Sequence, residues 1–190
     1  MSESSKVGQL SLYVGPMCSG KSDRLVDLHE RARNNPHRRA AIIAPLISRD
    51  ATSKEITSRT GKFCSADFVE TLDSTLIGRF LNGEYTDVFV DEGQFFSKLG
   101  NDELFNFCDV LTRRGVDVYV AALNSDYMRR CWPSVTPLYA LSPTIVQLSA
   151  WCTNCREDAV YTRRISSSRE LVDVHGTYEP ACRICYHKQE

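Results

Sequence analysis

The chain has 190 residues, of which 42% are hydrophobic and 25% are charged, and its formal net charge is −1. This composition is typical of one globular domain, or of one domain with a small appendage, and it argues against a disordered chain. Proteins that bind nucleic acid usually carry a basic excess, so we expect no nucleic-acid partner. The first residues lack the apolar core of a signal peptide, and no apolar run approaches the roughly 18 residues of a membrane span. We therefore expect a cytoplasmic chain without a membrane partner.

The chain begins with a predicted strand, loop and helix. Residues 9–15 form an apolar run that predicts a strand, and the apolar spacing across residues 21–34 predicts a helix that ends before Pro36. The loop between them matches G-x-x-x-x-G-K-[ST] in full. In such a loop backbone amides surround a polyphosphate, the lysine reaches the β- and γ-phosphates, and the serine hydroxyl helps to hold Mg²⁺. The predicted phosphate-binding residues for a nucleoside triphosphate are Gly15, Pro16, Met17, Cys18, Ser19, Gly20, Lys21 and Ser22.

Apolar strands and helices alternate along the chain as far as residue 150. A polar stretch without periodicity, residues 48–62, interrupts them and is predicted to be a mobile loop. Such alternation predicts an α/β fold with a parallel sheet covered on both faces, whose ligands bind outside the carboxyl ends of the strands. The further predicted strands span residues 40–44, 87–91, 116–123 and 144–150, and a predicted helix spans residues 101–114.

Two acidic residues, Asp91 and Glu92, follow the strand that ends at Val90. Successive residues that leave a strand point in different directions. Asp91 can therefore face Mg²⁺ and the phosphates, while Glu92 faces an acceptor hydroxyl as a general base. A solvated acidic strand end is the simpler alternative, but the phosphate loop in the same chain favours the catalytic interpretation. Phe95 and Tyr127 lie just past strand ends and are candidates to stack on a base.

The four cysteines after residue 150 form two C-x-x-C pairs. Zn²⁺ prefers four soft ligands in a tetrahedron, and each pair supplies two from one tight turn, so we predict a structural zinc site. A predicted hairpin of residues 161–165 and 170–174, with a turn at 166–169, fills the space between the pairs. A redox dithiol or simple buried cysteines are the alternatives. The zinc ligands are Cys152, Cys155, Cys182 and Cys185, and the expected domains span residues 1–148 and 149–190.

These motifs, in this order, resemble the zinc-containing (type II) thymidine kinases of the cellular cytosolic, bacterial and large DNA-virus type. The phosphate loop is similar to that of the family, and residues 91–96, DEGQFF, are similar to its acidic motif. Residues 121–123 followed by Tyr127 resemble its nucleoside-binding strand end, and the cysteine pairs match its zinc site. The resemblance covers nearly the whole chain and implies a P-loop domain with a small C-terminal zinc-ribbon lid domain.

The resemblance implies transfer of the γ-phosphoryl group of ATP to the 5′-hydroxyl of thymidine, for nucleotide salvage. Glu92 would take the proton of that hydroxyl, and Asp91 and Ser22 would serve Mg²⁺. Arg49 and Gln94 would bind the donor phosphates. A lid would close on the nucleoside and exclude water. The substrate-binding residues would be Phe95, Leu123, Tyr127, Arg129, Val172, Asp173, Val174, His175, Gly176 and Tyr178.

The resemblance also implies a homotetramer and inhibition by thymidine triphosphate. Two other functions fit parts of the sequence. A P-loop ATPase would use the acidic pair to activate water, and it would hydrolyse ATP without a nucleoside. A zinc-ribbon NTPase that binds nucleic acid would show steeply salt-dependent binding to DNA or RNA.

Overall fold

The computed structural model describes residues 6–47, 54–57, 60–167, 170–173 and 176–188. Its largest element is a six-stranded sheet with the strand order β5-β2-β6-β7-β1-β8. All neighbouring strands are parallel, so the predicted α/β fold is confirmed. The strands are β1 (Leu10–Gly15), β2 (Ala40–Pro45), β5 (Asp67–Val69), β6 (Asp87–Val90), β7 (Asp117–Leu123) and β8 (Thr144–Gln147).

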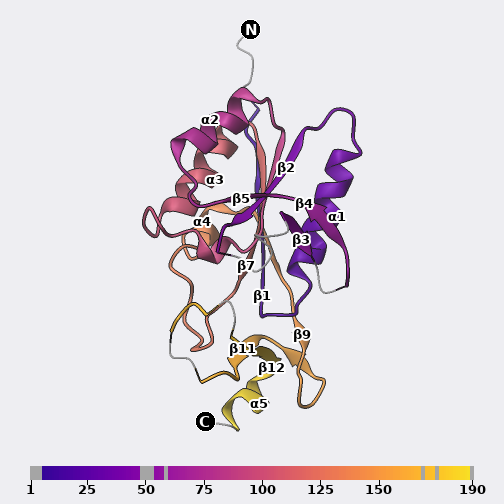
Figure 1. Ribbon diagram of the computed structural model, residues 1–190, viewed down its shortest axis with the longest axis vertical. Coiled ribbons are helices and arrows are strands. Elements are labelled where there is room, and N and C mark those ends of the chain that lie inside the picture. The colour runs from indigo at the N-terminus through magenta and orange to yellow at the C-terminus, as the bar shows by residue number, and fades with distance from the viewer. Residues whose placement is uncertain (1–5, 48–53, 58–59, 168–169, 174–175, 189–190) are drawn as a thin grey trace.

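Helices cover both faces of the sheet (Figure 1). Helix α1 (Lys21–Arg33) lies on one side, whereas α2 (Ser74–Asn82), α3 (Glu103–Arg113) and α4 (Leu138–Leu141) lie on the other. Successive strand residues point to opposite faces of the sheet, so β6 contributes side chains to the hydrophobic core on each face. Val88 and Val90 pack on the side of α3, and Phe89 packs on the side of α1. The sheet with these helices is called the sheet body below.

A small hairpin and two short elements differ from the sequence-based predictions. Within the predicted loop 48–62, β3 (Glu55–Thr57) pairs with β4 (Phe63–Ser65), while residues 48–53 and 58–59 lie outside the described residues. The loop prediction was wrong for β3, because a three-residue strand with one buried side chain, Ile56, gives no period to detect. Strand β5 and helix α2 were not predicted at all.

The predicted strand 144–150 is divided in two. Strand β8 ends at Gln147, and β9 (Ala150–Trp151) leaves the sheet to pair with β10 (Asp158–Ala159). Leu148 still donates its amide to the carbonyl oxygen of Val14, at 2.7 Å. The apolar run therefore marks the passage from the sheet body to a second, smaller lobe.

This Cys-rich lobe contains β9, β10, β11 (Tyr161–Arg164), β12 (Tyr178–Ala181) and α5 (Arg183–His187), and it lies below the sheet body in Figure 1. A hairpin between the two cysteine pairs is present, but the predicted partner of β11 was wrong. Strand β11 pairs with β12, with Arg164 opposite Tyr178, and the described residues 170–173 are not its partner. The apolar residues Leu171 and Val172 suggested a strand, but they line a cavity instead.

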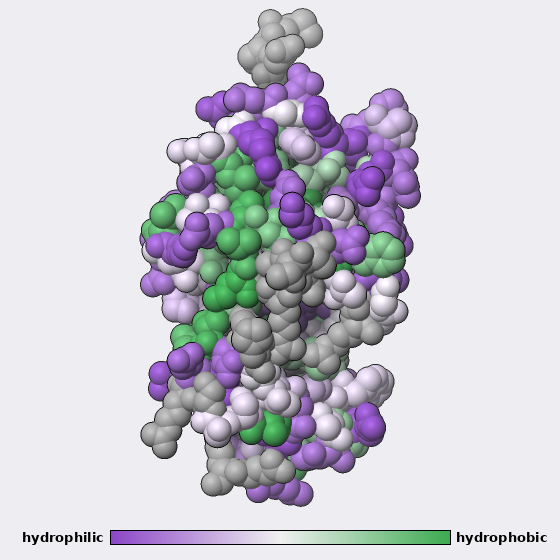
Figure 2. Space-filling model, viewed as in Figure 1, coloured by the Kyte–Doolittle hydropathy of each residue, from purple (hydrophilic) through white to green (hydrophobic). Residues whose placement is uncertain are grey.

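The surface in Figure 2 is mainly polar on the side of α1, and apolar side chains gather on the side of α2 to α4. Within the part of the chain that the structure describes, no helix has the length and apolarity needed to cross a membrane.

Candidate active site

The loop between β1 and α1 is tightly turned. Cys18 and Gly20 have φ values of 65° and 79°, in the left-handed region. Gly15 has no room for a side chain, because a Cβ there would lie 2.6 Å from the carbonyl oxygen of Leu148. Lys21 is 9% exposed, and its ammonium group donates to the carbonyl oxygen of Pro16 at 2.7 Å and to Ser19 Oγ at 3.4 Å. The loop thus presents a lysine and the amino end of α1 to the space above it.

The acidic pair follows β6, next to this loop. Asp91 is 4% exposed, and burial together with the charge of Glu92 raises its pKa to about 7, although a hydrogen bond from Ser22 opposes the shift. Glu92 has a left-handed backbone, with φ of 50°, and its amide donates to Asp91 Oδ1 at 2.9 Å. Asp91 interacts with Ser22 and Lys21 of the loop, whereas the Glu92 carboxylate accepts the side-chain amide of Gln94.

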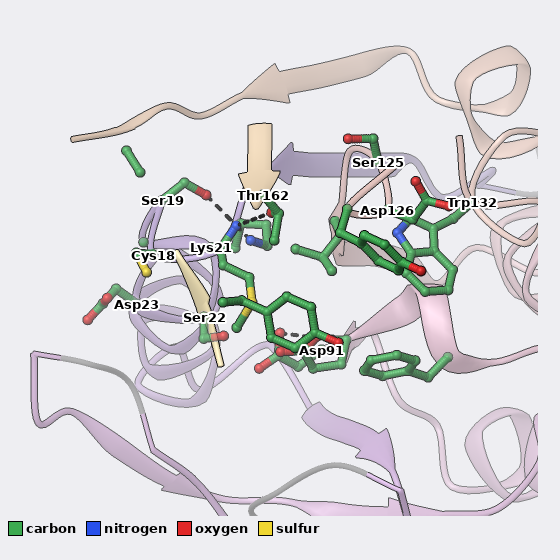
Figure 3. Close-up of a pocket in the computed structure, with 18 of the residues that line it drawn as sticks. Cys18, Ser19, Lys21, Ser22, Asp23, Asp91, Ser125, Asp126, Trp132 and Thr162 are labelled. Atoms are coloured by element: carbon green, nitrogen blue, oxygen red, sulfur yellow. Dashed lines mark hydrogen bonds between the residues drawn. The ribbon is translucent and has the colours of Figure 1, made fainter. Parts of the chain in front are cut away.

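Both acidic residues and residues 17–22 of the loop line one cavity of about 800 Å³. In Figure 3, Ser19, Lys21 and Thr162 lie on one side of this cavity and Ser125, Asp126 and Trp132 on the other. Asp91 lies between the two groups. The volume is within the range of sites that hold small molecules and cofactors.

The cavity also receives most of the predicted nucleoside-binding residues. They come from the turn after β6, from the end of β7 and the segment after it, from the loop before β12 and from β12 itself: Phe95, Leu123, Tyr127, Val172, Asp173 and Tyr178. Arg129 and Gly176 are not among the lining residues; Arg129 instead contacts His187 Nε2 at 3.0 Å and stacks over the Tyr186 ring. Arg49, Val174 and His175 lie outside the described residues.

Arg164 connects the walls of this cavity. Its guanidinium carbon lies 3.8 Å from the ring centroid of Tyr127 and 5.0 Å from that of Tyr178. It also donates to the hydroxyl oxygen of Tyr178 at 2.5 Å and to the carbonyl oxygen of Leu171 at 3.3 Å. One planar cation therefore joins β12, the loop before it and the segment after β7.

Sequence reasoning missed Thr162, Ser125 and Trp132. Thr162 is 2% exposed, and its hydroxyl oxygen accepts the amide of Met17 at 3.0 Å, which ties the Cys-rich lobe to the β1–α1 loop. Ser125 Oγ and Trp132 Nε1 are buried at the cavity without a hydrogen-bond partner in the described structure. Thr162 lies 145 residues from its partner, so no local signal could identify it.

The predicted cysteine quartet converges in space. The sulfur atoms of Cys152, Cys155, Cys182 and Cys185 lie within 4.8 Å of one another. A tetrahedron of sulfur atoms about 2.3 Å from Zn²⁺ would have edges of about 3.8 Å, so the cluster fits zinc with a small contraction. Cys182 Sγ accepts the amide of Cys185 at 3.4 Å, which orients the thiolate at the start of α5. The four sulfur atoms would fill all positions of a tetrahedral ion, as in structural sites.

Fold and site together define a class: a parallel α/β protein whose ligand cavity lies at the carboxyl ends of its strands, closed by a Cys-rich lobe. The sequence model described as "Thymidine kinase" matches residues 8–186. The human protein "Thymidine kinase, cytosolic" is 31% identical over 189 residues, covering 96% of this chain and 74% of that protein. The chain therefore belongs to the thymidine kinase family, a family of transferases, and the resemblance seen in the sequence is confirmed.

Viral and bacterial relatives match as well. "Thymidine kinase" of Choristoneura fumiferana entomopoxvirus is 29% identical, covering 94% of this chain and 96% of that protein. "Thymidine kinase" of Mesomycoplasma hyopneumoniae (strain 7448) is 27% identical, covering 94% of this chain and 95% of that protein. The similarity to these two relatives thus extends over almost the full length of both partners.

Proposed function

We propose that this chain is an ATP-dependent thymidine kinase with a P-loop. One observation carries the proposal: the β1–α1 loop, the acidic pair and an aromatic wall line a single cavity. The loop is suited to a polyphosphate, and the wall to a flat base. A carboxylate between them is where a proton acceptor for the attacking hydroxyl is needed.

In the proposed reaction, the 5′-oxygen of thymidine attacks the γ-phosphorus of ATP while Glu92 accepts the hydroxyl proton. The bond from the γ-phosphorus to the β–γ bridging oxygen breaks, and the products are thymidine monophosphate and ADP. Lys21, already held inside the loop by Pro16 and Ser19, stabilises charge on the donor phosphates. Positioning and electrostatic stabilisation supply most of the rate enhancement in such a transfer.

Ser22 and Asp91 are the proposed Mg²⁺ ligands, assisted by water. Ser22 lies close enough to the buried carboxylate to lower the pKa of Asp91, and both residues supply the hard oxygen atoms that Mg²⁺ prefers. When bound, the ion neutralises charge on the β- and γ-phosphates. Gly15 to Ser22 and Arg49 remain the proposed residues for ATP itself.

The nucleoside is proposed to lie against Phe95, Leu123 and Tyr127, under the loop that precedes β12. Residues 172–176 of that loop hold the base largely through backbone hydrogen bonds, and Tyr178 closes the far side. Arg129 stays a weaker proposal for the acceptor side, because it does not line the cavity. Residues 1–148 then act as the ATP-binding domain and residues 149–190 as the zinc-ribbon and lid domain.

Zinc in the Cys-rich lobe, a homotetramer, inhibition by thymidine triphosphate and a cytoplasmic location complete the proposal. The converging sulfur atoms support the zinc, and relatives named as cytosolic support the location. Membership of the family supports the homotetramer and the inhibition by thymidine triphosphate.

The test is transfer of labelled γ-phosphate from ATP to thymidine in the presence of Mg²⁺, with free phosphate followed in a reaction without nucleoside. We expect labelled thymidine monophosphate and little free phosphate. Rapid release of phosphate without nucleoside would instead identify an ATPase, and salt-dependent retention of DNA or RNA would identify a nucleic-acid-binding NTPase.

A further inference from the structure

The side chain of Gln94 is enclosed at the turn that follows the acidic pair. Gln94 is 1% exposed and does not line the cavity, unlike its neighbours Glu92 and Phe95. Its Oε1 accepts the amide of Leu123 at 3.0 Å, and its Nε2 donates to Glu92 Oε2. The side chain therefore spans the gap between the carboxylate of Glu92 and the end of β7.

The orientation of this amide follows from its neighbours. The backbone amide of Leu123 can only donate, so the Gln94 atom that faces it must be the oxygen. The NH₂ group then points to Glu92, whose Oε2 accepts the hydrogen bond. Leu123 lies opposite Gly15 in the β1–β7 register, and both end strands whose loops line the cavity. Gln94 thus ties Glu92 to a fixed point beside the β1–α1 loop.

Among the residues that the structure describes, Gln94 is the hydrogen-bond partner of the Glu92 carboxylate. Its backbone lies in the left-handed region, with φ of 50° and ψ of 40°, where residues other than glycine are uncommon. Gly93 follows without a side chain, because a Cβ there would lie 2.8 Å from Val120 Cγ1. The turn itself is a single 3-10 turn, Gly93–Phe95. The hydrogen bond from Gln94 restrains the rotamer of the carboxylate on this turn.

We infer that Gln94 is a positioning residue for Glu92. By joining the carboxylate to the amide of Leu123, it holds the proton acceptor beside the start of the phosphate loop. This role rests on the proposed function, and it replaces the sequence-based role of Gln94 as a phosphate ligand. A phosphate cannot reach the Gln94 amide, since both its polar atoms are engaged and buried.

The decisive variant is Gln94→Met, which keeps the length of the side chain and removes both hydrogen bonds. We expect kcat to fall at least about tenfold, because a small misplacement of a catalytic group is costly. The KM for ATP and the KM for thymidine stay within about twofold of the wild type, since the residue touches neither substrate. Gln94→Glu keeps an acceptor for Leu123 but faces Glu92 with a second carboxylate, so it loses kcat even if Gln94→Met does not fold.

Ser134→Ala is the matched control. Ser134 is 1% exposed, and its hydroxyl donates to the carbonyl oxygen of Gln94 at 2.9 Å, so the variant removes a buried hydrogen bond to the same residue and leaves the bridge to Glu92 intact. We expect a lower Tm and a kcat within about twofold of the wild type. An equal loss of kcat in Ser134→Ala would reduce Gln94 to a structural role and overturn the inference.

The double variant Glu92→Gln/Gln94→Met tests whether Gln94 acts through Glu92. If it does, the double variant is no slower than Glu92→Gln alone. Three results would each overturn the inference: a double variant whose loss of kcat is the product of the losses of the two single variants, an unchanged kcat in both Gln94 variants, or a raised KM for ATP at normal kcat. With an active wild-type enzyme, none of these results would contradict the proposed function. A wild type that transfers no phosphate to thymidine would overturn the proposed function, and the inference with it.

Discussion

The end of β6 and the Cys-rich lobe both face the cavity, but they are held in different ways. All four residues of β6 are buried, and apolar clusters flank the strand on both faces of the sheet. The lobe has a small core of its own, made of Ala150, Cys152, Ala159 and Cys182. Two of these four residues are proposed zinc ligands. The sheet body can therefore fix the proposed catalytic groups by packing, whereas the lobe would depend on the proposed metal and on polar contacts.

The difference assigns separate tasks to the two regions. The sheet body carries the phosphate loop and the acidic pair, whose geometry must not vary during the reaction. The lobe carries Tyr178 and the loop before it, and two side chains of the lobe contact Tyr127. Arg164 stacks on the Tyr127 ring, and the Tyr186 hydroxyl donates to the Tyr127 carbonyl oxygen at 2.5 Å. A segment held by few contacts can open for a nucleoside and close over it. The following experiments test this division, from the largest expected effect to the smallest.

Loss of the metal should affect the lobe most. We expect about one zinc per chain, and we expect Cys182→Ser to lose the metal and more than a hundredfold in kcat/KM for thymidine, because structural zinc contributes roughly 10 kcal/mol to the folding of small domains. Metal analysis and steady-state kinetics measure both effects. Cys131→Ser is the control, since Cys131 is exposed and lies outside the cluster. A freshly purified, active protein without zinc would contradict the account.

Removal of the Tyr127 ring should weaken nucleoside binding without changing ATP binding. We expect Tyr127→Ala to raise the KM for thymidine roughly tenfold to a hundredfold, since it removes a half-buried aromatic ring and the stacking partner of Arg164. Tyr127→Phe keeps the ring, and its KM should stay within about threefold of the wild type. Equal rises in the two KM values of Tyr127→Ala would show that the base lies elsewhere.

The sheet body should show a stability that depends on His29 at acidic pH. His29 is 3% exposed and packs edge-on against Phe89, and burial lowers its pKa from 6.5 to about 4. Below pH 6.5 His29 binds a proton in the unfolded chain before it does so in the folded protein. The free energy of unfolding therefore falls as the pH falls towards 4, by as much as about 3 kcal/mol.

Denaturant unfolding of the wild type and of His29→Leu at several pH values measures this effect. The difference between the two proteins cancels the contribution of the cysteine ligands, which also bind protons at low pH. His37→Leu serves as the control, because His37 is exposed. If the difference in the free energy of unfolding between the wild type and His29→Leu is the same at pH 7 and pH 5, His29 is not the source of the pH dependence.

The sequence predicted the sheet body better than the lobe, for a physical reason. Strands β1, β2, β6 and β7 are apolar runs because both faces of each are covered, so each run is visible locally. Strand β5 has three residues, of which one is exposed and two are half-buried, so it shows no alternating pattern to detect. The pairing of β11 with β12 depends on contacts across a long loop, and local periodicity favoured the wrong partner.

The candidate site divides in the same way. The phosphate loop, the acidic pair and the cysteine pairs are short motifs in which spacing alone fixes the geometry, and the structure brings each together. Thr162, Trp132 and the bridge from Gln94 to Leu123 depend on contacts between distant segments. Such contacts leave no signal in one sequence, because each residue type is also common in a core.

The division between the two regions is tested most directly by measuring kcat and both KM values for Glu92→Gln and Arg164→Lys in one assay. Glu92→Gln should lower kcat roughly a hundredfold or more at unchanged KM values, since it removes the general base. Arg164→Lys keeps the charge but loses the planar contacts with Tyr127 and Tyr178, so the KM for thymidine should rise severalfold and kcat should stay near that of the wild type. A Glu92→Gln variant with normal turnover, or an Arg164→Lys variant that loses kcat at an unchanged KM for thymidine, would contradict the account.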